Sequence, residues 1–145
     1  MGLIDDPKLQ RLVYRSISLM DPDDQAGVTS MVLKAEATNS RAGLSGCLAL
    51  ADGRFVQVLE GGSDRLHALM GRILADRRHR SIDILGTRDI TARLFKSWGM
   101  TRIAVPISSP ELVRIVTQTG GAAHVTGILL GLLEGGEGRV SIQNV

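Results

Sequence analysis

Gln57 is the residue whose type and position most directly suggest chemistry. It lies in the run Arg54 to Gly61, where Phe55, Gln57 and Leu59 share one face of a predicted strand. A carboxamide on a buried face has two donors and two acceptor sites, and it is costly to bury without partners. Two interpretations follow. Gln57 is either a core residue satisfied by backbone groups or water, or it meets a ligand or a polar side chain.

A few other residues have polar or aromatic side chains that could interact with Gln57 or with a ligand. Tyr14 is the only tyrosine and shares a strand face with Ser16, while Trp98 is the only tryptophan and precedes Met100 by two positions. Asn39 stands near the end of a predicted helix. A phenol can donate one electron if its proton leaves at the same time, and a neighbouring amide provides a path. An amide also stores two hydrogen-bond patterns, because its donor and acceptor ends can exchange. Each residue alone has a simpler interpretation as a core or helix-end residue.

Apolar periodicity predicts the elements that position these residues. Strands are expected over 9–18, 44–50, 54–61, 82–90 and 99–105. Asp52-Gly53 between two apolar runs predicts a tight hairpin, since such a turn needs positive φ. We expect Asp21 to cap the first helix and Pro22 to take its first position. Ser63 is expected to cap the second helix, whose apolar stripe contains Leu66, Leu69, Met70, Ile73 and Leu74.

This order of elements predicts an α+β fold with a ferredoxin-like βαββαββ sheet. Right-handed crossovers place both helices on one face of the sheet. We expect strands 9–18 and 54–61 to be parallel central neighbours. A C-terminal helical extension, with helices over 110–119 and 123–133, is expected to cover the other face. The remaining tail is either loose or a short strand at 140–142.

Composition excludes several functional classes. The chain has 145 residues, of which 43% are hydrophobic and 22% charged, and its net charge of +2 with one short basic run argues against nucleic acid. Cys47 is the only cysteine, which excludes an internal disulfide and fits a reducing cytoplasm. Residues 128–133 are too short to span a bilayer, which needs about 20 apolar residues. The three histidines are widely separated, so no metal site is expected. These features predict a cytoplasmic protein without membrane segments.

Five motifs follow one another along the chain. They are Leu12-Val13-Tyr14-x-Ser16, Asn39-x-x-x-Gly43-Leu44-Ser45-Gly46, Asp52-Gly53-Arg54-Phe55-Val56-Gln57-Val58-Leu59-Glu60-Gly61, Asp76-Arg77-Arg78-His79 and Phe95-x-x-Trp98-x-Met100. In this order the sequence resembles the BLUF family, blue-light sensors that use a flavin. The resemblance covers about Leu9 to Val105. Its specific parts are the Phe-x-Gln-x-Leu-Glu-Gly run and Trp-x-Met.

The resemblance implies a flavin ring held between the two helices above the sheet. Tyr14 matches the residue that donates an electron and a proton to the excited flavin. Gln57 matches the glutamine that bridges this tyrosine to the flavin, and whose rearrangement produces a small red shift. Asn39 matches the asparagine at the flavin carbonyl edge. Trp98 and Met100 match the pair near Gln57 that is thought to transmit the signal. The ring walls and the contacts to the ring edge or phosphate chain match Met31, Ile73, Arg72, Asp76, Arg78 and His79.

The implied function is a blue-light photoreceptor with no enzymatic activity of its own. The resemblance implies FAD, with FMN or riboflavin as alternatives, because the ring-contacting residues read only the shared isoalloxazine. Residues 1–105 would form the flavin-binding domain, and 106–145 would form an extension too small for a catalytic module. Output would then pass to an unidentified downstream protein or through a homo-oligomer.

Two other interpretations remain open at this stage. The chain could be a flavin-free, ferredoxin-like protein-interaction module, although it retains all the photochemical residues. It could instead be a small enzyme of acylphosphatase type, but Arg15 and Gly27-Val28-Thr29 do not supply the basic phosphate loop that this chemistry needs. Fold analogy cannot separate these functions. A flavin absorption spectrum would.

Overall fold

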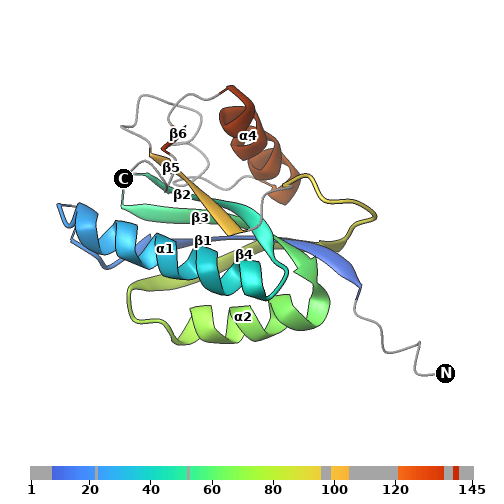
Figure 1. Cartoon of the computed structure of the whole chain (residues 1–145), viewed down its shortest axis with the longest axis horizontal. Coiled ribbons are helices and arrows are strands. Elements are labelled where there is room, and N and C mark those ends of the chain that lie inside the picture. Colours follow the sequence, from blue (N-terminus) through green and yellow to red (C-terminus); the bar gives the residue numbers. More distant parts are fainter. Residues whose placement is uncertain are drawn as a thin grey trace.

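The computed structural model describes residues 8–21, 23–51, 53–95, 99–104, 121–135 and 139–140. Within these ranges a single sheet has the strand order β4-β1-β3-β2-β5-β6, with helices on both of its faces (Figure 1). The elements are β1 (Leu9–Ser18), α1 (Gln25–Arg41), β2 (Ser45–Ala51), β3 (Arg54–Gly62), α2 (Ser63–Ala75), β4 (His79–Asp89), β5 (Gly99–Ala104), α4 (Ala122–Gly135) and β6 (Arg139–Val140). The predicted strand 9–18 has the observed bounds.

β3 is a central strand, paired with β1 on one side and with β2 on the other. The prediction that β1 and β3 are neighbours is confirmed, but the prediction that they run parallel is wrong, since their pairing is antiparallel. The reason is topological. The crossover through α1 carries the chain to β2 in the direction of β1, and the hairpin then reverses it into β3. Gly53 makes this hairpin possible with a φ of 71°. The antiparallel register places Tyr14 directly opposite Gln57.

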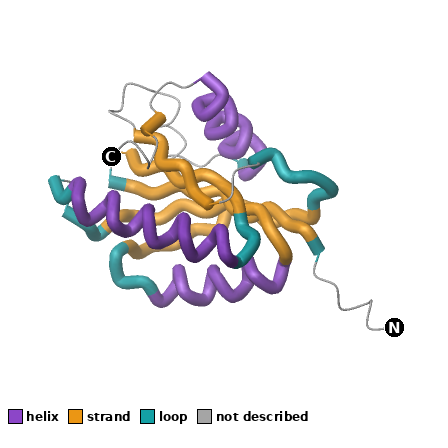
Figure 2. Tube along the Cα trace, in the orientation of Figure 1, coloured by secondary structure: helices purple, strands orange, loops and turns teal. Residues whose placement is uncertain are grey.

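The sheet separates two hydrophobic cores, each covered by helices. α1 and α2 lie on one face and α4 lies on the other (Figure 2). Alternation along β3 divides its side chains between the cores: Phe55 and Leu59 face the helix pair, whereas Val56 and Val58 face α4. Burying such a side chain stabilises the fold by about 2 kcal/mol. The prediction that residues 123–133 form a helix on the second face is therefore confirmed. The predicted helix 110–119 lies outside the described residues.

The first helix begins later than predicted. Asp24 is its N-cap, and the Asp24 carboxylate accepts a hydrogen bond from the Gly27 N–H at 2.8 Å. Asp21 instead organises the preceding turn, where its carboxylate accepts from the Asp23 N–H at 2.9 Å. Three aspartates compete for the cap, and the one that reaches an N–H three residues ahead takes it. Pro22 lies outside the described residues.

The second helix also departs from the prediction at both ends. Gly62, rather than Ser63, is its N-cap, and no side chain caps it. Ser63 is already helical, and its N–H donates to the Lys8 carbonyl at 2.8 Å. At the other end Leu74 is 61% exposed, so it does not belong to the buried stripe. β4 begins at His79 rather than at residue 82, so the basic residues that follow Asp76 lie in or next to this strand.

Several remaining predictions concern the chain away from the helix pair. Cys47, the single cysteine, is buried. The short C-terminal strand is β6, which pairs with β5. In the part of the chain that the structure describes, none of the helices has the length and apolarity needed to cross a bilayer. In the same residues, no group of His, Cys, Asp and Glu side chains is placed to hold a metal ion.

Candidate functional site

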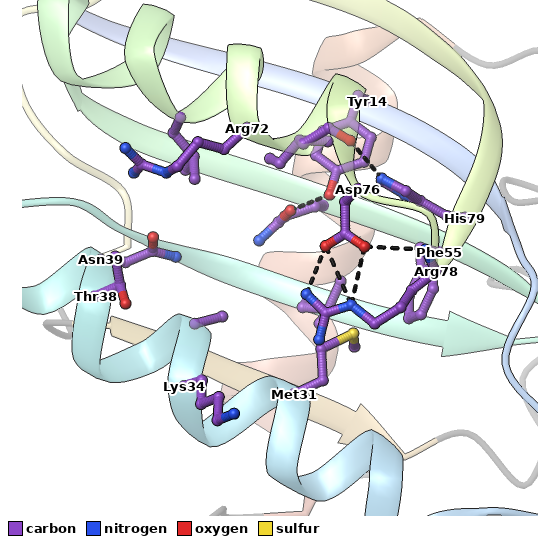
Figure 3. Close-up of a pocket in the computed structure, with 15 residues that line it drawn as sticks. Tyr14, Met31, Lys34, Thr38, Asn39, Phe55, Arg72, Asp76, Arg78 and His79 are labelled. Atoms are coloured by element: carbon purple, nitrogen blue, oxygen red, sulfur yellow. Dashed lines mark hydrogen bonds and ion pairs between the residues drawn. The ribbon is translucent and has the colours of Figure 1, made fainter.

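A cavity of about 340 Å³ lies between α1, α2 and the sheet (Figure 3). All nine residues that the resemblance assigns to cofactor contact line this cavity. Sequence reasoning missed six further lining residues: Lys34, Ala35, Thr38, Leu48, Phe55 and Leu69. Helical spacing could have indicated the first three, because they lie three, four and seven residues after Met31 on the same face of α1.

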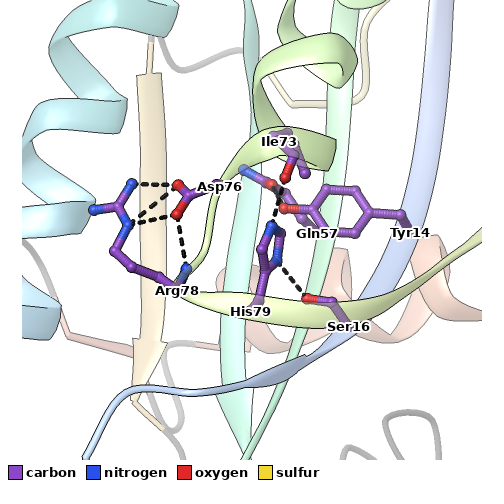
Figure 4. Close-up of polar contacts among 7 residues, drawn as sticks. All are labelled: Tyr14, Ser16, Gln57, Ile73, Asp76, Arg78 and His79. Carbon is purple, nitrogen blue, oxygen red and sulfur yellow. Dashed lines mark hydrogen bonds and ion pairs between the residues drawn. The ribbon is translucent and has the colours of Figure 1, made fainter.

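Tyr14 and Gln57 form a buried hydrogen-bonded pair at the floor of the cavity. Their side chains are 4% and 5% exposed, and the Tyr14 hydroxyl donates to Gln57 Oε1 (Figure 4). Directly opposed residues in an antiparallel pair have Cβ atoms about 5 Å apart, so the register of β1 and β3 brings the two groups together. Gln57 thus meets a polar side chain, which favours the second of the two sequence interpretations.

The environment of Tyr14 keeps its phenol neutral. Burial raises the pKa of the Tyr14 hydroxyl far above its usual value, and the nearby Asp76 carboxylate raises it further. Tyr14 therefore retains a proton to donate to Gln57 over the whole physiological range. The raised pKa also links stability to pH, since the unfolded chain loses this proton first.

We expect no tyrosinate signal from the folded protein up to about pH 10, the usual pKa of tyrosine. Denatured protein should titrate near that value, and the free energy of unfolding contributed by Tyr14 should be full below it and fall as the pH rises further. Because Tyr14 is the only tyrosine, tyrosinate absorbance reports this residue alone. A folded sample that titrates together with the denatured one would contradict the burial argument.

The side-chain amide of Asn39 is buried and has no hydrogen-bond partner among the described residues. Asn39 is 2% exposed, in the last turn of α1, and it lines the cavity. Its backbone carbonyl accepts from the N–H groups of Ala42 and Leu44, but among the described residues its side chain makes no hydrogen bond. A buried amide without partners is costly. The cavity wall therefore offers a hydrogen-bonding edge to whatever occupies it.

His79 joins three elements behind the Tyr14 ring. Its Nε2 lies 2.8 Å from the carbonyl oxygen of Ile73, and its Nδ1 lies 2.8 Å from Ser16 Oγ (Figure 4). A carbonyl can only accept, so Nε2 carries the hydrogen. The imidazole meets the rings of Tyr14 and Phe55 edge-on, with centroids 6.3 and 6.2 Å away. His79 thus ties α2, β4 and β1 together and supports the ring of Tyr14.

Asp76 and Arg78 form an ion pair at the rim of the cavity. Arg78 Nε donates to Asp76 Oδ1 at 2.9 Å, and the Arg78 backbone N–H donates to the same oxygen at 2.9 Å. These bonds lower the pKa of Asp76 to about 2, and the carboxylate in turn raises the pKa of Arg78. Both groups are charged at neutral pH. Arg72 and Lys34 add two further cations around the cavity.

The Asp76–Arg78 ion pair should make the free energy of unfolding depend on pH in acidic solution. A carboxyl whose pKa falls on folding stabilises the native state fully above its unfolded pKa, here 3.8, and loses that effect as the pH falls through about 2. Arg78 is half exposed, so screening leaves a contribution of about 1 kcal/mol. Asp76→Asn should therefore lessen the fall in the free energy of unfolding between these two pH values. Urea denaturation at several pH values measures this. An equal fall in the free energy of unfolding for the variant and the parent would refute the prediction.

The described residues do not include the whole of the remaining predicted pair, Trp98 and Met100. Trp98 lies outside the described residues. Met100 is in β5, where its backbone pairs with Gly46 of β2, so one strand separates it from β3. The structure thus brings together in one cavity the nine residues that the resemblance assigns to cofactor contact, and it leaves the placement of the Trp98 and Met100 side chains as a prediction.

The cavity suits a flat aromatic group with a polar edge and a charged chain. Met31 and Ile73 come from facing helices, and both pack against the same core cluster. Asn39 and Gln57 present amides, which match the alternating donors and acceptors along one edge of a flavin ring. The cations at the rim suit a phosphate-bearing chain.

Comparisons with known proteins identify the family. The family model described as BLUF, sensors of blue-light using FAD, matches residues 9–101. The chain is 32% identical over 100 residues to the photoactivated adenylate cyclase subunit alpha of Euglena gracilis, an alignment that covers 68% of this chain and 10% of that protein. The chain thus spans about a tenth of the length of that relative.

Two solved structures share the fold. BlrB, a BLUF protein in its dark state, is 27% identical with a TM-score of 0.75, over 86% of this chain and 97% of that one. Klebsiella pneumoniae BlrP1, in a complex with calcium and cyclic diGMP, is 26% identical with a TM-score of 0.66, over 88% and 34% of the two chains. The family match covers more than half of the chain, and the tyrosine–glutamine pair is in place. This protein belongs to the BLUF family of flavin-based blue-light sensors.

Proposed function

We propose that the cavity holds the isoalloxazine ring of FAD non-covalently and that Tyr14 and Gln57 form its photoactive pair. The observation that carries this proposal is the hydrogen bond between these two buried side chains, in the same cavity as the Asn39 amide, for which the described residues supply no partner. Met31 and Ile73 would wall the ring. Gln57 and Asn39 would hold its polar edge.

The flavin would supply absorption of blue light and an excited state able to accept an electron. Tyr14 would give up an electron and its phenolic proton, and both would return to it as the switch forms. The raised pKa of Tyr14 supports coupled transfer, because loss of the proton alone would leave a buried anion. Gln57 accepts the Tyr14 hydrogen bond and so lies on the path that the proton would take.

Gln57 would store the signal. In the observed arrangement its Oε1 accepts from Tyr14. Reversing or tautomerising the amide exchanges donor and acceptor at nearly constant shape, so the buried site can hold two hydrogen-bond patterns. A changed pattern at the ring edge would shift the absorption slightly to the red. The signal is then a local hydrogen-bond change that a two-state element of the fold must read.

The rim of the cavity favours a flavin with phosphates. The cationic side chains of Arg72, Arg78 and Lys34 surround it, and Arg78 is oriented by Asp76. These cations would contact the phosphate chain of FAD or FMN, whereas riboflavin lacks phosphate. Chromatography of the chromophore released on denaturation identifies the flavin. Recovery of riboflavin alone from cells would contradict this part of the proposal.

Output would pass to other proteins rather than to an active site in this chain. Residues 1–105 would act as the sensing domain and 106–145 as a cap, with Trp98 and Met100 relaying the change.

We further propose that the protein works in the cytoplasm as a homo-oligomer with a separate downstream protein. The sheet ends at β4, an edge strand that no described element pairs on its outer side. Sedimentation showing only monomer at working concentrations would reject the oligomer.

An absorption spectrum recorded in darkness and then under blue light tests the proposed function. We expect a flavin spectrum that shifts slightly to the red and recovers in the dark. A coloured protein without a shift would retain the binding site and reject the switch. A colourless protein that FAD, FMN and riboflavin all fail to reconstitute would reject both, and it would favour the flavin-free interaction module.

A further inference from the structure

Glu60 is a fully buried carboxylate on the face of β3 opposite the flavin cavity. It is 0% exposed and lies three residues after Gln57. Its Oε2 accepts from Arg11 Nε at 2.8 Å and from the Leu94 N–H at 3.1 Å, and its Oε1 accepts from the Phe95 N–H at 2.7 Å. A buried charge is retained only when such donors surround it. Glu60 therefore holds β3 to the segment that precedes β5.

Arg93 makes the reciprocal contacts from that segment. Its Nη1 donates to Ser45 Oγ at 2.8 Å and to the Glu60 carbonyl at 3.0 Å, and its Nη2 donates to the Gly43 carbonyl at 2.8 Å. α1 ends at Arg41, two residues after Asn39, and Gly43 lies in the turn that follows, whose flanking residues Ala42 and Leu44 donate to the Asn39 carbonyl. Arg93 thus binds the ends of β2 and β3 and the turn that follows Asn39. The guanidinium suits this task because its donors have a fixed planar geometry.

Phe95 connects this arrangement to α4. Its side chain is 3% exposed and packs in the core cluster that contains Val125 and Leu129 of α4. Leu94 also lines a cavity shared with the first turns of that helix. The loop that carries residues 93–95 passes beside the start of α4 in Figure 1. Any displacement of this loop would change the surface on which α4 is packed.

We propose that Glu60 and Arg93 transmit the change at Gln57 to α4. We call these two side chains and their hydrogen-bond partners the clamp. Gln57 and Glu60 lie on one strand, while Asn39 leads into the turn that Arg93 binds. The clamp therefore joins both cavity amides to the segment 93–95 and, through Phe95, to α4. Glu60 and Arg93 are positioning residues. Neither lines the flavin cavity.

The physical basis is the directionality of charge-assisted hydrogen bonds. Two consecutive backbone N–H groups and a guanidinium converge on one carboxylate, so movement of β3 must move segment 93–95 or break strong bonds in a dry site. A packed interior passes such displacements on because it is nearly incompressible. This inference rests on the proposed function, which supplies the change at Gln57.

Hydrogen–deuterium exchange of the flavin-loaded chain, in darkness and under blue light, tests the clamp. In the parent protein we expect illumination to alter exchange across α4. Glu60→Gln keeps the side-chain shape but removes the charge, so one acceptor becomes a donor. We expect this variant to keep the red shift and the dark exchange of α4, while the light–dark difference in α4 falls at least about fivefold.

Asp83→Asn is the matched control, because it makes the same change in the exposed Arg15–Asp83 ion pair outside the clamp. It should keep both the red shift and the response of α4. If Glu60→Gln does not fold, Arg93→Lys gives the same comparison, since lysine keeps the charge but lacks the planar fork of donors.

The outcomes separate the clamp from the proposed function. A Glu60→Gln variant with the full α4 response would overturn the clamp, and so would a parent protein that shows the red shift without any α4 response. Equal changes in dark and lit exchange would also overturn it, since they would indicate a merely structural role. A parent protein without a red shift would instead reject the proposed function.

Discussion

Gln57→Leu should abolish the light-induced red shift while the flavin stays bound. Leucine has nearly the same size, so the cavity keeps its shape, but it has no donor or acceptor to exchange. The Tyr14 hydroxyl then loses its acceptor, which should lower the free energy of unfolding by about 1–3 kcal/mol. Loss of the amide contact to the ring should weaken flavin binding by about tenfold. Dark and lit absorption spectra, with a flavin titration, measure these effects.

The matched control is Thr38→Val, which replaces a polar side chain by an apolar one of similar shape in the same cavity. Thr38 is exposed at the end of α1 and lies away from the buried pair. It should keep the red shift. A Gln57→Leu protein that still shifts and recovers like the parent would show that the amide does not store the signal.

Tyr14→Phe should remove the photochemistry at its first step. Phenylalanine keeps the ring that packs against His79, but it has neither the hydroxyl proton nor the same ability to donate an electron. Loss of a positioned proton donor should lower the yield of the red-shifted form by at least about 100-fold. Flavin fluorescence should rise, because the excited state is no longer quenched by this residue. Quantum yields of the shift and of fluorescence give both results.

Ser16→Ala is the appropriate comparison, since it deletes a hydroxyl two residues away on the same face of β1. This change removes a hydrogen bond to His79 and leaves the bond between Tyr14 and Gln57 intact. We expect it to keep the red shift. Equal losses in Tyr14→Phe and Ser16→Ala would mean that disturbance of β1, rather than the phenol, explains the result.

Short-range patterns in the sequence predicted most of the elements, and the family resemblance predicted nine of the fifteen residues that line the cavity. The bounds of β1 and the hairpin at Gly53 followed from alternation and turn chemistry, which depend on neighbouring residues only. Asn39, Gln57 and Tyr14 could be named because their spacing matched a known family. Helix starts were less well predicted, since several adjacent residues can cap and only the local geometry selects among them.

Interactions between distant residues were decided by the tertiary structure. The direction of β3 relative to β1 depends on combining a crossover with a hairpin, and it sets the opposition of Tyr14 and Gln57. The contacts of Glu60 with Leu94 and Phe95 had no sequence signal, because a glutamate at the end of a strand is ordinarily exposed. The sequence by itself determined which groups this sensor possesses. Only the fold determined which of them touch, because side chains far apart in the chain meet through strand register and packing.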